Sequence, residues 1–244
     1  MLGTLLLITA AAAASPSAQT LPAQEIVEIN RGMIEQIVRD YLLDHPEIIP
    51  EAMTRLKDKQ IAHNIASHRK AVETPYGGAW EGAAEPDVTV VEFFDYACGY
   101  CRITVPEIAR LVSEDKKIRI VYREMPILTP VSREAARVAL LAARKGNYMA
   151  FHNAAFVAPH LTHEAVLAAA QGAGIDAASA EAAIASKSED GEIDSNLTLF
   201  QEMQGTGTPT FVIGNQIVVG AVGYDGLKQA IAKARVGAHP VVAK

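Results

Sequence analysis

The 244-residue sequence predicts an α/β protein with a helical insertion and a helical arm near its N-terminus. A near-continuous apolar run rich in β-branched residues at 88–94 is typical of a buried strand, and "KIRIVYREM" at 117–125 alternates like a strand. An alanine-rich stretch at about 130–200 has helical character, and "TFVIGNQIVVGA" at 210–221 is typical of a β-hairpin. The predicted order is therefore arm, strand, helix, strand, several helices, hairpin and closing helix.

The composition supports a sizeable core and excludes some partners. Half of the residues are hydrophobic, 20% are charged, and the formal net charge is −6 at pH 7. The sequence has no block of clustered Lys and Arg, which argues against nucleic acid as the main partner. No apolar run reaches the roughly 18 residues that a membrane-spanning helix needs.

The first residues, "MLGTLLLITAAAAASPSAQT", form an apolar run followed by small and then polar residues. This order is typical of a secretory signal peptide, although the usual basic start is missing. We expect a signal peptide at 1–18, cleaved near Ala14 or Ala18, and export of the rest. The alternative is a short N-terminal segment without a targeting role.

Residues 19–72 are expected to form a helical arm. Apolar residues recur there at steps of three and four, and "DHPEIIPEAM" interrupts the pattern with Pro46 and Pro50. An amphipathic helix outside the main domain must bury its apolar stripe. It can pack on its own domain or on a second copy of the chain, and the residues leave both arrangements open.

Residues 73–87, "ETPYGGAWEGAAEPD", contain two prolines and three glycines and show neither helical nor strand periodicity. We expect a linker between the arm and the main domain at 88–244, with its helical insertion at about 130–200. The charged segment "KSEDGEIDSN" at 187–196 is expected to be a solvated turn.

Cys98 and Cys101 are the only cysteines, and they lie three residues apart where the first strand gives way to a helix. A disulfide between them would close almost no loop and would stabilise the fold little. Their spacing therefore indicates chemistry. A zinc site would need about two further ligands, and a haem attachment would need histidine where Arg102 stands. An inert pair is the remaining alternative.

A helix N-terminus stabilises a thiolate, so Cys98 is expected to be the nucleophile of disulfide exchange. Cys101, one turn further and more buried, is expected to attack the mixed disulfide and release the product. Gly99 and Tyr100 between them are expected to tune the redox properties. This chemistry requires neither a metal nor a cofactor.

A second motif, "GTGTPTFVIG", places Pro209 directly before the hairpin. Proline cannot donate to a sheet ladder and therefore belongs at the start or edge of a strand. Taken alone, the motif is compatible with an ordinary trans turn.

Together, "FFDYACGYC", "GTPTFVIG" and "VVGAVGYDGLKQAI" resemble the DsbA-like thioredoxin-fold disulfide enzymes of the bacterial periplasm, over about residues 85–238. The resemblance implies a cis Pro209 beside the cysteines and a Thr208 whose backbone pairs with substrate. It also implies that Glu92, six residues before Cys98, is a buried acid that moves protons during exchange. From the residues alone, a solvent-facing Glu92 is the alternative.

The arm segment "VRDYLLDHPEIIPEAM" looks like the N-terminal extension of the suppressor-of-copper-sensitivity protein C (ScsC) and Com1-like subgroup. This resemblance implies a periplasmic disulfide isomerase with a role in copper tolerance, a homodimer or higher oligomer joined through the arm, and a membrane-bound thiol reductase as electron donor. Its substrates would be unfolded or misoxidised proteins.

Two other functions stay open. CGYC departs from the CPHC of strong oxidants and favours a milder enzyme, but a DsbA-type dithiol oxidase is compatible with the sequence. A non-catalytic copper-binding or chaperone protein is also possible, because thiolates suit Cu(I). The proline motif counts against this last alternative, since holding a metal does not require it.

Overall fold

The computed structural model describes residues 23–238, with side chains from 30 to 237. The chain divides into two compact units, Met1–Thr54 and Arg55–Lys244. The expected signal peptide at 1–18 lies outside the described residues. None of the helices between residues 23 and 238 is both long and apolar enough to span a membrane.

The described residues of the first unit are helical, as predicted for the arm. Helix α1 (Ala23–Asp44) ends just before Pro46, and α2 (Ile48–Glu73) begins just after it and continues into the second unit. The apolar stripe of α1 is exposed, with at least half of each side chain accessible in Met33, Ile34, Ile37, Val38 and Tyr41.

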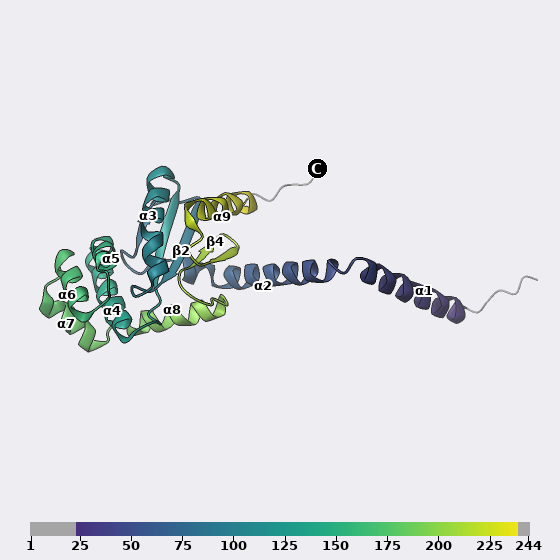
Figure 1. The fold of residues 1–244 in the computed structure, drawn as a ribbon, viewed down its shortest axis with the longest axis horizontal. Helices are drawn as coiled ribbons and strands as arrows, with labels where there is room; N and C mark the ends of the chain where they lie inside the picture. The colour runs from purple at the N-terminus through teal and green to yellow at the C-terminus, as the bar shows by residue number, and fades with distance from the viewer. Residues whose placement is uncertain (1–22, 239–244) are drawn as a thin grey trace, which may run out of the picture. The chain divides into compact units, whose positions relative to one another are not determined.

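The second unit is built on a five-stranded sheet of order β1-β3-β2-β4-β5. Figure 1 shows its neighbouring strands β2 and β4. The strands are β1 (Trp80–Gly82), β2 (Val88–Phe94), β3 (Ile118–Glu124), β4 (Thr210–Ile213) and β5 (Gln216–Val219). Only β2 and β3 run parallel, and all other neighbours are antiparallel. This is the thioredoxin-like α/β class that the sequence predicts.

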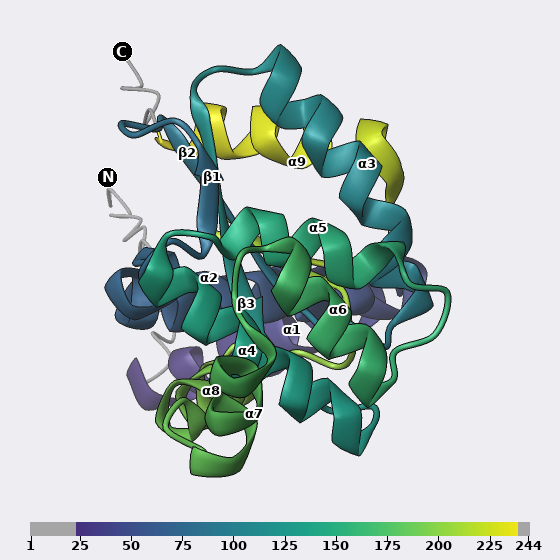
Figure 2. The same ribbon diagram turned by 90° about the vertical axis from the view of Figure 1, so that its left-hand side faces the viewer.

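Helices cover both faces of this sheet, and two of them pack together on one face. Helices α3 (Gly99–Glu114) and α9 (Gly223–Ala238) pack against each other and against the sheet, and Figure 2 shows them side by side. The opposite face is covered by α8 (Asp190–Glu202) and the second half of α2. The insertion contributes α4 (Pro130–Lys145), α5 (Tyr148–Val157), α6 (His163–Gly172), α7 (Ala177–Ser186) and α8.

Strand β2 is central and buried on both faces, which explains its almost continuous apolar sequence. Because successive side chains of a strand point to opposite faces, Val90 and Phe94 join the cluster under α3 and α9. Val91 and Phe93 join the cluster under α2 and α8. Glu92 lies on the same face as Val90 and therefore faces α3.

The segment expected to be a linker, 73–87, is structured. Trp80–Gly82 pairs with β3 as the edge strand β1, which is too short to give a periodic pattern in the sequence. The boundary between the two compact units lies instead inside α2, between Thr54 and Arg55. Ile65 and Val72 of α2 are fully buried in the core of the second unit.

The charged segment at 187–196 is largely helical rather than a solvated turn. Helix α8 begins at Asp190, and Glu189 before it is only 2% exposed. The Glu189 carboxylate accepts a hydrogen bond from the Tyr76 hydroxyl at 2.7 Å and pairs with Arg144 at 2.6 Å. These partners are remote in sequence, so the local pattern could not reveal them.

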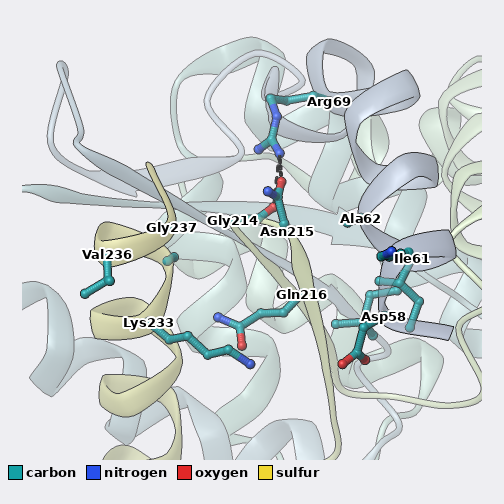
Figure 3. A pocket seen from close by; sticks show the side chains of 13 residues that line it. Asp58, Ile61, Ala62, Arg69, Gly214, Asn215, Gln216, Lys233, Val236 and Gly237 are labelled. Atoms are coloured by element: carbon teal, nitrogen blue, oxygen red, sulfur yellow. Dashed lines mark hydrogen bonds between the residues drawn. The ribbon is translucent and has the colours of Figure 1, made fainter. Parts of the chain in front are cut away.

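Arg69 fastens α2 to the turn between β4 and β5. Its Nη2 donates to Asn215 Oδ1 at 2.5 Å and to the Gly214 carbonyl at 3.3 Å (Figure 3). Gly214 has a φ of 61°, the left-handed region that glycine tolerates best. A cavity of about 770 Å³ lies beside this contact, between α2, β5 and α9.

Replacing Arg69 by alanine is expected to destabilise the second unit by about 1–2 kcal/mol, because hydrogen bonds from a charged donor are lost. Urea unfolding of the two proteins measures the difference. Lys59→Ala, on the same helix and lining the same cavity, is the control and should change stability by less than about 0.5 kcal/mol. Equal effects of the two substitutions would contradict the fastening role.

Candidate active site

Cys98 is the N-cap residue of α3, directly after the loop that leaves β2. Its sulfur accepts a hydrogen bond from the backbone N–H of Cys101 at 3.4 Å, as expected for a side chain that caps a helix. Its own N–H donates to the Asp95 carbonyl at 3.0 Å, which closes the loop. The Cys98 sulfur thus lies where the positive end of the helix dipole favours a thiolate.

Cys101 lies one turn further into α3 and is 1% exposed, against 6% for Cys98. Burial strongly raises the pKa of the Cys101 thiol, and the charge of Glu92 raises this pKa further. Cys101 therefore remains protonated unless a neighbouring base takes its proton. The two sulfurs differ in access and in electrostatic surroundings, as their expected roles require.

The Thr-Pro motif lies against the cysteines although it is remote in sequence. The Thr208–Pro209 peptide bond is cis, and the Cys98 thiol donates to the Thr208 carbonyl at 3.3 Å. Pro209 is buried, whereas Thr208 is partly exposed. The Pro209 carbonyl accepts a hydrogen bond from the Gly220 N–H at 2.8 Å, which ties this end of β4 to the end of β5.

Glu92 lies beneath the cysteines and is 2% exposed. Its carboxyl accepts a hydrogen bond from Thr104 Oγ1, on α3, at 3.0 Å. Burial raises the pKa of Glu92 to about 8, the Thr104 hydrogen bond opposes the shift, and the charge of Glu81 adds to it. Glu92 therefore carries a proton in most molecules at neutral pH and can exchange it close to that pH.

Gly99 and Tyr100 form the outer surface of the CGYC turn. The Tyr100 side chain is 66% exposed, and a Cβ added at Gly99 would meet no atom within 4 Å. Neither residue is held by the core, so both positions can change without repacking it.

Sequence reasoning missed a buried polar group on the insertion side of the site. The hydroxyls of Tyr148 and Tyr96 donate to Glu124 Oε1 at 2.9 and 3.4 Å, and Tyr96 also meets His152 Nδ1 at 3.3 Å. Burial holds the pKa of Glu124 well above its usual range and lowers the pKa of His152 to about 3. His152 is therefore uncharged at neutral pH. Together, Glu124 and His152 fix Tyr96, two residues before Cys98.

Sequence reasoning also missed Asp95, which directly follows β2, and Thr104, the hydrogen-bond partner of Glu92. Asp95 is visible in the sequence as the acidic residue of "FFDYACGYC". Its role could not be predicted, because its partners Ile127 and Leu128 are far away in the sequence. Between residues 23 and 238, no group of three or more His, Cys, Asp or Glu side chains is arranged to hold a metal ion.

Two protein families match separate parts of the chain. The family described as "DSBA-like thioredoxin domain" matches residues 89–232, and that described as "Copper resistance protein ScsC N-terminal domain" matches residues 33–62. The first match spans more than half of the chain and contains both cysteines and Pro209. The second spans parts of α1 and α2.

Solved structures show the same architecture. A thioredoxin-like oxidoreductase from Silicibacter pomeroyi DSS-3 is 39% identical, with a TM-score of 0.61, over 64% of this chain and 91% of that one. The thiol-disulfide exchange protein alpha-DsbA2 from Wolbachia pipientis is 26% identical, with a TM-score of 0.66, over 73% and 97%. A linker-deletion mutant of Proteus mirabilis ScsC is 21% identical, with a TM-score of 0.67, over 92% and 100%, and shares the fold.

Curated relatives include the Na(+)/H(+) antiporters NhaA 3 of Salinispora tropica and NhaA 1 of Salinispora arenicola. Each is 34% identical over 74 residues, and the chain spans only 11% of the length of either. The family match, by contrast, covers β3, β4, β5 and all of β2 except Val88. The chain therefore belongs to the DsbA-like thioredoxin domain family of thiol-disulfide oxidoreductases and combines this domain with a ScsC-type N-terminal domain.

Proposed function

We propose that the chain is an exported thiol-disulfide isomerase that shuffles non-native disulfides in substrate proteins through its CGYC dithiol. The observation that carries this proposal is the position of the Cys98 sulfur, at the start of α3 and 3.3 Å from the Thr208 carbonyl. A polypeptide that pairs with the backbone of Thr208 would bring its disulfide to Cys98.

In the proposed reaction, the Cys98 thiolate attacks one sulfur of a substrate disulfide. A Cys98–substrate disulfide forms, the substrate S–S bond breaks, and the second substrate sulfur leaves as a thiolate. That thiolate, or another from the same substrate, can attack a different disulfide and finally displace Cys98, which leaves the substrate rearranged and the enzyme dithiol unchanged. Alternatively, Cys101 attacks Cys98, the substrate is released reduced, and a Cys98–Cys101 disulfide forms.

We assign the neighbouring residues on this basis. Cys101 is the resolving cysteine, and Thr208 and Pro209 present the substrate backbone. Glu92 accepts the proton that Cys101 must lose before it attacks. Gly99 and Tyr100 set the balance between the dithiol and the disulfide.

The N-terminal unit supports isomerisation rather than simple oxidation. The exposed stripe of Met33, Ile34, Ile37, Val38 and Tyr41 is a surface that a second copy can cover, and the ScsC-type match spans this region. We propose a homodimer or higher oligomer joined through α1, which presents several CGYC sites to one substrate. A membrane-bound thiol reductase would keep these sites reduced, and export to the periplasm agrees with the expected signal peptide.

Reactivation of a scrambled multi-disulfide protein in redox buffer tests the isomerase proposal. The full chain should reactivate it well, and a chain that begins at Arg55 should be much less active while keeping its reaction with small disulfides. Arg55 is the appropriate start because α2 beyond it contributes Ile65 and Val72 to the catalytic core. Low reactivation by both proteins would favour the DsbA-type oxidase, which should instead donate disulfides rapidly to a reduced substrate.

Ile37→Glu is expected to dissociate the oligomer, because a charge buried at a helix interface is costly. Light scattering at several protein concentrations measures the mass. The control is Arg39→Gln, which makes the net charge more negative by one, as Ile37→Glu does, at a residue outside the apolar stripe. A monomeric wild-type chain, or the same mass for all three proteins, would contradict assembly through α1.

Tyr100→His is expected to make the enzyme more oxidising. An imidazolium beside the start of α3 stabilises the Cys98 thiolate and hence the reduced form. The equilibrium constant with glutathione should shift about tenfold toward the dithiol, which corresponds to roughly 30 mV. Tyr100→Phe, which adds no charge, is the control, and a similar constant for all three proteins would contradict the tuning role.

Cu(I) titration addresses the non-catalytic alternative. Tight copper binding by Cys98 and Cys101 without any disulfide exchange would favour a copper-binding or chaperone protein over an enzyme.

A further inference from the structure

Asp95 joins the loop that carries Cys98 to a second loop of the catalytic unit. Its carboxylate is 1% exposed and lies between the end of β2 and the start of α3. Oδ1 accepts the N–H of Ala97 at 2.8 Å, within the Cys98 loop. Oδ2 accepts the N–H groups of Ile127 and Leu128 at 2.8 and 2.9 Å, from the segment between β3 and α4.

These three hydrogen bonds satisfy a buried charge with backbone dipoles. Asp95 has no ion pair with any of the residues that the structure describes, so the amide N–H groups provide the compensation that burial of a carboxylate requires. Hydrogen bonds to a charged acceptor are the stronger class and hold their donors in a defined geometry. Asp95 therefore fixes the position of the 127–128 segment relative to the Cys98 loop.

The segment that Asp95 holds exposes apolar side chains beside the reactive turn. Ile127 and Leu128 are about half exposed, and Tyr100 and Ile103 on the first turns of α3 are more than half exposed. Apolar side chains that stay exposed close to a reactive group can contact a ligand. The Met125 N–H donates to the Phe94 carbonyl at 2.8 Å before this segment, and Thr129 caps α4 after it. Between these two points, Asp95 provides the side-chain hydrogen bonds that hold the segment.

We propose that Asp95 is a positioning residue for exchange with polypeptides, and that Ile127 and Leu128 contact an apolar residue of the substrate close to its reacting cysteine. This inference rests on the proposed thiol-disulfide exchange and specifies its substrate class as segments that carry an apolar residue beside the disulfide. Asp95 touches neither the substrate nor a reacting sulfur through its side chain. It acts by holding the two loops that do.

The variant that tests this proposal is Asp95→Asn. Asparagine has a single acceptor oxygen, so it cannot accept from both loops: its NH₂ group must face either the Ala97 N–H or the N–H groups of Ile127 and Leu128. The Cys98 N–H still donates to the backbone carbonyl at position 95, so the reactive turn itself keeps its closure. Asp95→Asn should therefore break the link between the 127–128 segment and the Cys98 loop while the enzyme stays folded. Circular dichroism and urea unfolding check that the fold is kept.

The experiment compares two disulfides, glutathione disulfide and a peptide with leucine beside one cysteine of its disulfide. For Asp95→Asn, kcat/KM for the peptide should fall about tenfold more than for glutathione disulfide, mainly through KM. Leu128→Ser should show the same selective loss, and the double variant should lose little more than either single variant because the two changes act on one contact. Asp176→Asn, which alters an N-cap carboxylate on α7, is the control and should leave both reactions unchanged.

Equal losses for the two disulfides, or independent losses in the double variant, would overturn the positioning role. These results differ from failure of the proposed function. If the wild-type chain reacted with neither disulfide, thiol-disulfide exchange itself would be refuted. If it reacted with both, and Asp95→Asn kept the wild-type ratio, only the present inference would fail.

Discussion

Replacing Cys98 by alanine is expected to reduce disulfide exchange to the rate of the buffer alone. Cys101 cannot substitute for it, because Cys101 is 1% exposed and burial raises the pKa of its thiol. A protonated, inaccessible thiol neither meets a substrate disulfide nor attacks it efficiently. The measurement is exchange with a fluorescent peptide disulfide at pH 7, and sustained turnover by Cys98→Ala would refute the assignment of the nucleophile.

Cys101→Ala provides the matched control. The chain has only two cysteines, so any covalent adduct formed by this variant must be at Cys98. Because the resolving thiol is absent, the mixed disulfide should accumulate and appear as a heavier species in a non-reducing gel. Adducts formed by Cys98→Ala instead would reverse the two roles. Urea unfolding of both variants separates loss of chemistry from loss of fold.

Local patterns in the sequence were enough to predict the central part of this site. The apolar run of β2 is recognisable because both of its faces are buried, and Cys98 follows it at a helix start. The motif around Pro209 could be located in the same way, but only the fold brings Thr208 to 3.3 Å from the Cys98 sulfur. Only the family resemblance predicted that the two motifs lie close together, since no local pattern encodes a contact across 110 residues.

Other features depend on long-range contacts and could not be predicted from local patterns. The periodicity of α2 continues across Thr54 and Arg55, so nothing in it marks the boundary between the two compact units. Glu189 looks like a solvated charge until Tyr76 and Arg144 are placed beside it. Asp95 is a comparable case, because its function follows from amide groups more than 30 residues away.

Glu92→Gln is expected to change both the pH dependence of stability and the lifetime of the mixed disulfide. The folded chain releases the Glu92 proton at a pKa of about 8, whereas the unfolded chain releases it near the ordinary value of 4.5. Between these values the folded state retains a proton that the unfolded state has lost. Rising pH therefore favours unfolding in this window, by at most about 1.4 kcal/mol per pH unit, and the effect levels off above pH 8.

Glutamine cannot ionise, so the variant lacks this contribution. The free energy of unfolding of Glu92→Gln minus that of wild type should rise from about pH 4.5 to pH 8, as measured in urea. Titration of His152, whose pKa shift comes from burial alone, is common to both proteins and cancels in the difference. Thr104→Val removes the hydrogen bond that favours the charged carboxylate, so it should extend the window to higher pH. A difference independent of pH would contradict a raised pKa for Glu92.

The kinetic effect has a separate cause. Cys101 must lose its proton to displace the substrate from Cys98, and the ionised form of Glu92 is the nearby base proposed to accept it. Glu92→Gln should prolong the mixed disulfide about a hundredfold, as followed by acid quenching, while the first attack by Cys98 changes much less. A long-lived adduct together with the stability change would establish Glu92 as the proton acceptor. The stability change with an unaltered adduct lifetime would mean that Glu92 titrates in the fold but takes no part in the reaction.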